Sequence, residues 1–188
     1  MPKKKHTAES SIFKAILIFF FGFILLTILW VQVSNSYCYM ITLAASKVLA
    51  EIKDATLDEV VKKGDAFYVS MGFLRGHRRF VLGVILFSGY YAFSVPLTLS
   101  LLASLSLFIK RKKRACAEAL LILLLSHFLY VFFVEAKTLT EQSMINGIEP
   151  VSETLLSVYQ YLRNATEFTV MSFGPFLIAI YTFVRFRR

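Results

Sequence analysis

Residues 15–33 read AILIFFFGFILLTILWVQV and carry no charge. A transmembrane helix needs about 20 mostly apolar residues to cross about 30 Å of hydrocarbon, so this run is long enough to span a bilayer. Four lysines precede it, and Trp30 lies near its far end, at the depth where indole rings favour the membrane interface. Because the core of a signal peptide has only about 7–15 apolar residues, we expect a retained anchor. Cleavage near the small residues 34–36 is the alternative.

The composition of the whole chain also favours a membrane protein. Of its 188 residues, 57% are hydrophobic and 18% are charged. Soluble domains are usually about a quarter charged and less than half apolar, and a chain this apolar would not stay solvated as a disordered protein. These values exclude both classes and indicate an integral membrane protein.

Three further apolar runs follow the first. Residues 80–109 are uncharged, and as one helix they would be about 45 Å long, which exceeds the bilayer core. We therefore expect two elements there: a strand at Phe80–Phe87, rich in β-branched and aromatic residues, and a span at 90–109 that Pro96 kinks. Further spans are predicted at 115–134 and 168–184. The predicted fold class is a single α-helical membrane domain, residues 1–188, with four transmembrane helices.

The distribution of charge predicts the orientation of these spans. Short loops rich in Lys and Arg stay in the cytoplasm. With four spans, twelve basic and two acidic residues lie on one side (+10), and nine basic and ten acidic residues lie on the other (−1), which accounts for the net charge of +9. Both termini are therefore expected in the cytoplasm, with loops 34–89 and 135–167 outside. The basic surplus suits anionic lipids, and it does not indicate a nucleic-acid partner.

The first outer loop predicts a helix followed by a β-hairpin. Residues 37–52 place apolar side chains at near-helical spacing, which is typical of an amphipathic interfacial helix. This apolar stripe consists of Met40, Leu43, Ala44, Val48 and Ile52. The polar residues 53–65 follow, with a short helical turn expected at 57–61. Residues 65–74 then alternate, with Phe67, Val69, Met71 and Phe73 on one face, and Gly76 can supply the positive φ of a turn into 80–87. In the second outer loop, Asn146-Gly147 predicts a turn, and Pro150 opens a second amphipathic helix that runs to Arg163.

Neither the cysteines nor the histidines form a recognisable catalytic or metal-binding motif. Cys38 is expected outside and Cys116 inside, so the two cannot form an intramolecular disulfide. Cys38 could be a nucleophile that shares the outer compartment with His77, but the simpler interpretation is a small residue on an interfacial helix. His6, His77 and His127 fall at three different depths, so no metal site and no cofactor are expected.

Two ionisable residues fall inside the third predicted span. Glu118 lies four residues after Arg114, so an ion pair at the cytoplasmic boundary explains it. His127 lies about 18 Å into the span from residue 115, and an intramembrane ionisable group is a functional candidate. The alternative for His127 is a structural hydrogen bond to a neighbouring helix. Since nine positions separate the two residues, they are expected on opposite helix faces.

A concentrated basic cluster occurs in the outer loops, at Arg75, His77, Arg78 and Arg79. It contrasts with the otherwise acidic exterior. The side chains could contact lipid phosphates, or they could bind an anionic or carboxylate-bearing partner.

With this layout, the chain resembles the small exosortase-associated membrane proteins of bacteria. The similar features are the Lys-led span ending FFFGFILLTILWVQV, the segment GYYAFSVPLTLSLLASLSL, the loop IKRKKRA and the segment ALLILLLSHFLYVFFVEAKTL. The resemblance implies an accessory subunit of the inner membrane that works with an exosortase, a larger polytopic enzyme, or with the proteins it sorts. It carries no catalytic residue over to this chain.

The leading hypothesis is therefore a non-enzymatic accessory of a protein-sorting system in the bacterial inner membrane. Its expected partners are membrane lipids and an exosortase-like enzyme or its sorted substrates. The alternatives are a small membrane enzyme that uses Cys38, and a transporter or channel subunit.

Overall fold

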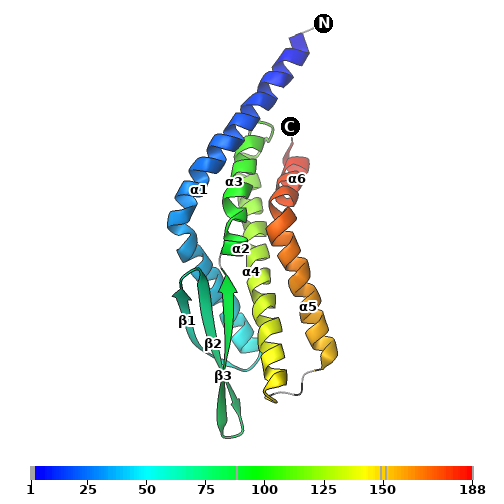
Figure 1. Ribbon diagram of the computed structural model, residues 1–188. Helices are drawn as coiled ribbons and strands as arrows, with labels where there is room; N and C mark the ends of the chain where they lie inside the picture. The colour runs from blue at the N-terminus through cyan, green and yellow to red at the C-terminus, as the bar shows by residue number, and fades with distance from the viewer. Residues whose placement is uncertain (1–2, 88, 149, 151, 188) are drawn as a thin grey trace. The chain divides into compact units, whose positions relative to one another are not determined.

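The computed structural model describes residues 3–87, 89–148, 150 and 152–187 (Figure 1). Its contacts divide the chain into two compact units. Unit 1 comprises Met1–Ser34, Phe93–Leu124 and Ser172–Arg188, and unit 2 comprises Asn35–Ala92 and Leu125–Met171. The helical elements are α1 (Lys3–Ile52), α2 (Gly89–Ala92), α3 (Ser94–Leu105), α4 (Lys112–Ile145), α5 (Glu153–Phe168), the π-helix η1 (Thr169–Phe173) and α6 (Gly174–Phe186).

Two helices of the described chain are long and apolar enough to cross a membrane. These are the segment Ser11–Ile52 of α1 and the whole of α4, Lys112–Ile145. They contain the first and third predicted spans. The second predicted span contains the shorter apolar helix α3, of 12 residues, and the fourth overlaps α6, of 13 residues. The π-helix η1 separates α6 from α5, and α6 begins with the pair Gly174-Pro175. A fold with two long candidate spans is therefore established, and the number four stays a prediction.

In unit 1, the end of α6 packs against the segment that joins α3 to α4. The backbone N–H of Lys110 donates a 3.1 Å hydrogen bond to the carbonyl of Phe186. Ile109, Ala115 and Phe186 form a buried apolar cluster there, with Leu105 packed against it. This packing fixes the basic end of α6 beside the basic loop that begins α4.

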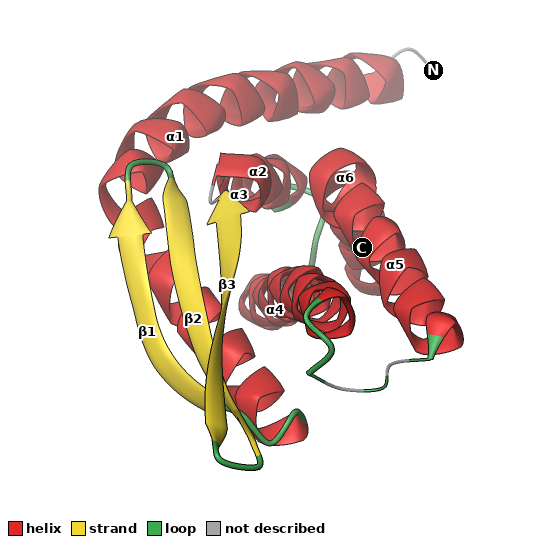
Figure 2. Cartoon of the chain, turned by 60° about the horizontal axis from the view of Figure 1, so that its bottom comes forward, coloured by secondary structure: helices red, strands yellow, loops and turns green. Residues whose placement is uncertain are grey.

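Unit 2 contains a three-stranded antiparallel sheet in the order β1-β2-β3, drawn side by side in Figure 2. The strands are β1 (Thr56–Lys63), β2 (Ala66–Arg75) and β3 (Arg78–Phe87). The predicted hairpin is thus β2 and β3, with a two-residue turn in which Gly76 has φ of 59°. The strand at Phe80–Phe87 is confirmed within β3.

The prediction of a helical turn at residues 57–61 is wrong, because this segment belongs to β1. Val60 and Val61 are β-branched and pair with Val69 and Tyr68 of β2. The charged residues that made the segment look like a loop lie on an edge strand, where charge discourages pairing with other chains. The hairpin therefore gains a third strand, which an isolated two-stranded element needs for stability.

One face of the sheet is buried within unit 2. The predicted alternation is confirmed, since Phe67, Val69, Met71 and Phe73 are at most 3% exposed. Leu82, Val84 and Leu86 of β3 are buried as well. The alternate positions of β3, such as Val81 and Ile85, stay exposed.

The prediction of a separate amphipathic helix at 37–52 is also wrong, because α1 continues through this segment without a break. Residues 34–36 include neither Pro nor Gly, so nothing in them ends a helix. The apolar stripe is not the face of this segment that is buried in unit 2. Met40 and Ile52 of the apolar stripe are 64% and 61% exposed. The buried side chains are Cys38, Ile41, Thr42, Ala45, Ser46, Leu49 and Ala50.

This inverted pattern is typical of helices in an apolar surrounding. Inside a membrane, small and weakly polar residues allow close packing between helices, whereas large apolar residues face lipid or a partner. Helix α5 likewise leaves Leu155 and Val158 exposed. It begins at Glu153 rather than at Pro150, because the hydroxyl of Ser152 caps it by accepting a 3.2 Å hydrogen bond from the N–H of Leu155.

Candidate functional site

Polar side chains from α1, α2 and α4 lie together in unit 2, all of them buried except the half-buried Tyr37, and we call this set the polar layer. It comprises Tyr37, Cys38, Thr42 and Ser46 of α1, Tyr91 of α2, and His127, Tyr130 and Glu135 of α4. Buried polar groups are costly unless they are hydrogen-bonded, so their pairing tells what the layer does. Two direct hydrogen bonds join α1 to α4 within it.

The first bond connects Tyr37 and His127. The Tyr37 hydroxyl lies 2.7 Å from Nδ1 of His127, whose side chain is fully buried. Which group donates depends on the tautomer of the imidazole. The rings of Tyr37 and Tyr91 contact the imidazole at centroid distances of 5.8 and 5.5 Å. His127 is therefore held by a hydrogen bond and two aromatic rings.

The second bond connects Ser46 and Glu135. The hydroxyl of Ser46 lies 2.8 Å from Oε1 of Glu135 and 2.7 Å from the backbone carbonyl of Thr42. Both side chains are fully buried. The second carboxyl oxygen, Oε2, has no hydrogen-bond partner in the described part of the chain. A carboxyl group in such a place is rare and is a functional candidate in a membrane protein.

Cys38 lies inside the polar layer and is 1% exposed. Its neighbours include the hydroxyl of Tyr91. A thiolate nucleophile needs access to its substrate and a nearby positive charge or base. The burial of Cys38 offers no open route for a substrate, whereas Cys116 of unit 1 is exposed.

Glu118 has a different set of partners, all in unit 1. Its carboxylate accepts from Arg114 at 3.0 Å, as the sequence predicted, and also pairs with Arg185 at 3.2 Å. The hydroxyl of Tyr181 donates a 3.3 Å hydrogen bond to the same carboxylate. The cluster thus joins the first turns of α4 to the last turns of α6 and holds exposed charges together at one end of unit 1.

The basic cluster lies at the tip of the β2–β3 hairpin, and all four side chains are exposed. Arg79 forms an ion pair with Asp58 of β1. The Nη1 of Arg75 donates a 3.3 Å hydrogen bond to the carbonyl of Gly147. Arg75 and Arg78 are register partners on either side of the turn. Arg75 and Arg79 therefore have structural contacts within unit 2, and His77 and Arg78 lie at the turn itself.

A glycine makes the Arg79–Asp58 pair possible. Gly72 of β2 lies between the two strands that carry them, and a Cβ at this position would lie 2.7 Å from Oγ1 of Thr56 and 2.8 Å from Nε of Arg79. The Arg79 side chain thus crosses the sheet over Gly72. This contact was not predicted from the sequence, because it depends on the register between three strands.

The sequence also missed Glu135. The positive-inside count assigned it to the beginning of the second outer loop, where an acidic residue is unremarkable. Glu135 lies eight residues, or about two turns, after His127 on α4. Buried positions recur every three or four residues along this helix, and Glu135 falls in that series, which is the periodicity that could have identified it. Among the described residues, no three of the His, Cys, Asp or Glu side chains are grouped to hold a metal ion.

Comparison with protein-family models identifies a related family. A family model described as an exosortase H-associated membrane protein matches residues 9–180 of the chain. No match was found among curated proteins or among solved structures. The matched range includes both long helices, the whole sheet, the polar layer and most of α6.

Proposed function

The chain belongs to the exosortase H-associated membrane protein family, and from this premise we propose that it is a non-enzymatic accessory subunit of an exosortase-type protein-sorting system in the bacterial inner membrane. The family match over residues 9–180 is the observation that carries this proposal. The structure adds surfaces through which such a subunit can bind a larger membrane enzyme or the proteins that the enzyme sorts.

The first such surface is the apolar exterior of the long helices. In α1, side chains from Ile12 to Val33 are largely exposed, with Phe21 at 71% and Val31 at 67%. In α4, Leu121 is 65% exposed. Such side chains face lipid or the helices of a partner. A subunit with this exterior can dock laterally on a polytopic enzyme.

The second surface is the tip of the sheet. Arg78 lies at the turn beside Arg75 and Arg79, and these arginines present positive charge to anionic or carboxylate-bearing groups, with His77 next to them as a hydrogen-bonding group. In the proposed orientation both termini are cytoplasmic, so this tip lies on the extracytoplasmic side. Lipid phosphates are the competing ligand for the same charges.

The polar layer supports a structural role for its own residues. His127 and Glu135 each form a hydrogen bond with a side chain of α1, so they fix the pairing of two helices rather than line an open path. The buried position of Cys38 gives the alternative of a cysteine enzyme less support than the accessory role.

The test is purification of the tagged full chain from its native membranes in mild detergent, followed by mass spectrometry. We expect an exosortase to be recovered at a constant ratio to the chain, and recovery to fail when the exosortase gene is deleted. Deletion of the gene for this chain should reduce sorting in cells that still express the enzyme. Stable exosortase activity without this chain, together with no recovered enzyme, would contradict the accessory role.

A further inference from the structure

A groove in unit 2 runs along the open edge of β3. Its volume is about 440 Å³, and it is lined by the end of β3, the middle of α4 and the last turns of α5. The lining residues include Ile85 and Phe87 of β3, Tyr130 and Thr138 of α4, and Arg163 and Glu167 of α5. One wall of the groove is thus a strand edge, and the opposite wall carries an ion pair.

The backbone of Ile85 points its hydrogen-bonding groups at this groove. β3 is an edge strand, and the side chain of Gln142 donates a 2.9 Å hydrogen bond to the carbonyl of Gly83. The Gly83 backbone therefore faces away from β2. In an antiparallel ladder the direction alternates along the strand, so the N–H and C=O of Ile85 also face the open edge. Gln142 covers the edge at Gly83, and the groove begins where that cover ends.

The two edges of the sheet differ in chemistry. β1 carries Asp58, Glu59, Lys62 and Lys63, and its pairing with β2 is irregular between Leu57 and Glu59. Charged residues and irregular pairing protect an edge from added strands. By contrast, residues 80–87 of β3 read FVLGVILF, with no charge and no proline. The edge of β3 is therefore the one suited to accept another strand.

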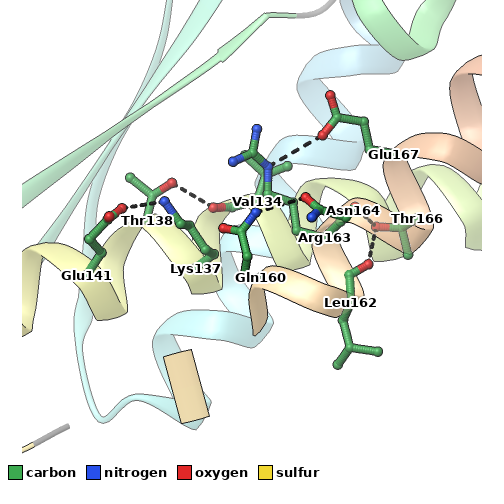
Figure 3. Close-up of polar contacts among 10 residues, drawn as sticks. All are labelled: Val134, Lys137, Thr138, Glu141, Gln160, Leu162, Arg163, Asn164, Thr166 and Glu167. Carbon is green, nitrogen blue, oxygen red and sulfur yellow. Dashed lines mark hydrogen bonds and ion pairs between the residues drawn. The ribbon is translucent and has the colours of Figure 1, made fainter. Parts of the chain in front are cut away.

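Arg163 supplies a donor on the opposite wall. Its Nε lies 3.6 Å from Oε2 of Glu167, which is an ion-pair distance and too long for a hydrogen bond. Figure 3 shows this pair on α5, next to the hydrogen bond between Gln160 and Asn164. The Nε atom is buried and has no hydrogen-bond acceptor among the described residues. The side chain as a whole is 33% exposed, so its accessible part can pair with an acidic group of a ligand in the groove.

We propose that this groove binds an extended peptide segment, which adds to β3 as a fourth strand and places an acidic side chain at Arg163. The three residues of β3 along the groove span about 10 Å, which matches three or four residues of an extended chain. The peptide backbone supplies both a donor and an acceptor for Ile85, whereas a lipid phosphate supplies acceptors alone. This inference goes beyond the accessory role, because it needs the groove and not an exosortase.

The experiment measures peptide binding to the full chain in nanodiscs of phosphatidylcholine. The probe is a fluorescent seven-residue peptide of alternating Thr and Val with a central Glu. Matched peptides carry Gln at the centre, or N-methyl groups on the three central amides. We expect the Glu peptide to bind more tightly than the Gln peptide, and the N-methylated peptide not to bind, because it cannot pair with a strand edge.

Two variants of the chain test the two walls separately. Arg163→Gln should raise the Kd of the Glu peptide roughly tenfold and leave that of the Gln peptide nearly unchanged. Ile85→Pro removes an N–H that makes no bond to β2, so it should abolish binding of both peptides while the sheet stays folded. Val81→Pro is the matched control, since Val81 has the same orientation on β3 and lies away from the groove.

Several outcomes overturn the proposal. These are equal binding of the N-methylated peptide, equal loss of binding in Val81→Pro, or no binding of the Glu peptide at millimolar concentration. A fourth is retention of phosphatidylglycerol that depends on Arg163, measured by native mass spectrometry, in place of peptide binding. None of these outcomes depends on co-purification with an exosortase, so the two proposals fail separately.

Discussion

Ser46 of α1 and Glu135 of α4 lie 89 positions apart in the chain, and their side chains are joined by a 2.8 Å hydrogen bond inside a fully buried site. A second hydrogen bond joins the same two helices about two turns away along α4, between Tyr37 and His127. Because buried polar groups are costly when unpaired, each bond penalises any shift of one helix along the other. The polar layer therefore specifies the register of α1 and α4 within unit 2, where apolar side chains alone would permit sliding.

The first prediction concerns the hydrogen bond between Ser46 and Glu135. Ser46→Ala should lower the free energy of unfolding by about 1–2 kcal/mol, since it leaves Oε1 of Glu135 without its partner. Glu135→Gln keeps an acceptor oxygen and should cost less, so the double-mutant cycle pairs Ser46→Ala with Glu135→Ala, which removes both oxygens. Unfolding by sodium dodecyl sulfate in mixed micelles measures the single variants and the double variant. A coupling energy of about 0.5–1.5 kcal/mol is expected from the double-mutant cycle. Strict additivity of the two substitutions would show that the bond contributes nothing.

The second prediction concerns Gly72. Gly72→Ala introduces a Cβ at 2.7–2.8 Å from the side chains of Thr56 and Arg79. Arg79 must then move, and we expect loss of its ion pair with Asp58 and destabilisation of the sheet by about 1–2 kcal/mol. Gly83→Ala is the matched control on the neighbouring strand, because the nearest atom to its Cβ would be 3.9 Å away. Limited proteolysis of residues 56–87 compares the two, and equal protection of both variants would contradict the prediction.

The third prediction concerns the two cysteines. In detergent-solubilised protein, a maleimide should label Cys116 rapidly and leave Cys38 unlabelled, because Cys38 is 1% exposed and Cys116 is exposed. Denaturation should make both thiols reactive. Cys38→Ala should leave sorting and partner recovery largely intact, and the Cys116→Ala variant identifies the labelled site by mass spectrometry. Loss of sorting in Cys38→Ala at normal expression would favour the enzyme hypothesis instead.

The fourth prediction concerns topology. Both termini and the basic loop 110–114 are expected in the cytoplasm, with residues 35–89 and 135–167 outside. In a variant without native cysteines, Lys112→Cys should react with a membrane-permeable reagent alone, whereas Asp65→Cys should also react with an impermeable reagent added from outside. Outer-side labelling at position 112 is incompatible with four spans in this orientation.

The sequence predicted local patterns well where one physical cause dominates. The alternation from Phe67 to Phe73 predicted a buried strand face, and Gly76 predicted the turn, because both depend on neighbouring residues. The expected ion pair of Arg114 and Glu118 is likewise a contact between residues four positions apart on one helix.

Contacts between distant segments were harder to predict. The charged residues of β1 did not indicate a strand, because what makes this segment a strand is its pairing with β2. The apolar stripe of residues 40–52 predicted one face of an interfacial helix, whereas the structure buries a different face that is rich in small and polar residues. Glu135 escaped notice because a hydrogen bond across 89 positions leaves no local pattern.

The last prediction concerns the tip of the sheet. Replacing Arg75, Arg78 and Arg79 together by Gln should weaken partner association and preserve membrane insertion, because orientation depends mainly on the short cytoplasmic loops. The structure sharpens this test. Arg79 pairs with Asp58 and Arg75 bonds to the carbonyl of Gly147, so the triple variant also loosens unit 2. Arg78→Gln alone removes charge at the turn without breaking either contact.

Exosortase recovery at low and high salt is the measurement, with Lys47→Gln as a control that removes an exposed outer charge from α1. If Arg78 contacts an acidic surface, recovery with the wild-type chain should fall as salt rises, since salt screens exposed charges. Recovery with Arg78→Gln should start lower and respond less to salt, and Lys47→Gln should follow the wild type. If Arg78→Gln and the wild type recover the enzyme equally at every salt concentration, the tip contacts lipid phosphates rather than the partner.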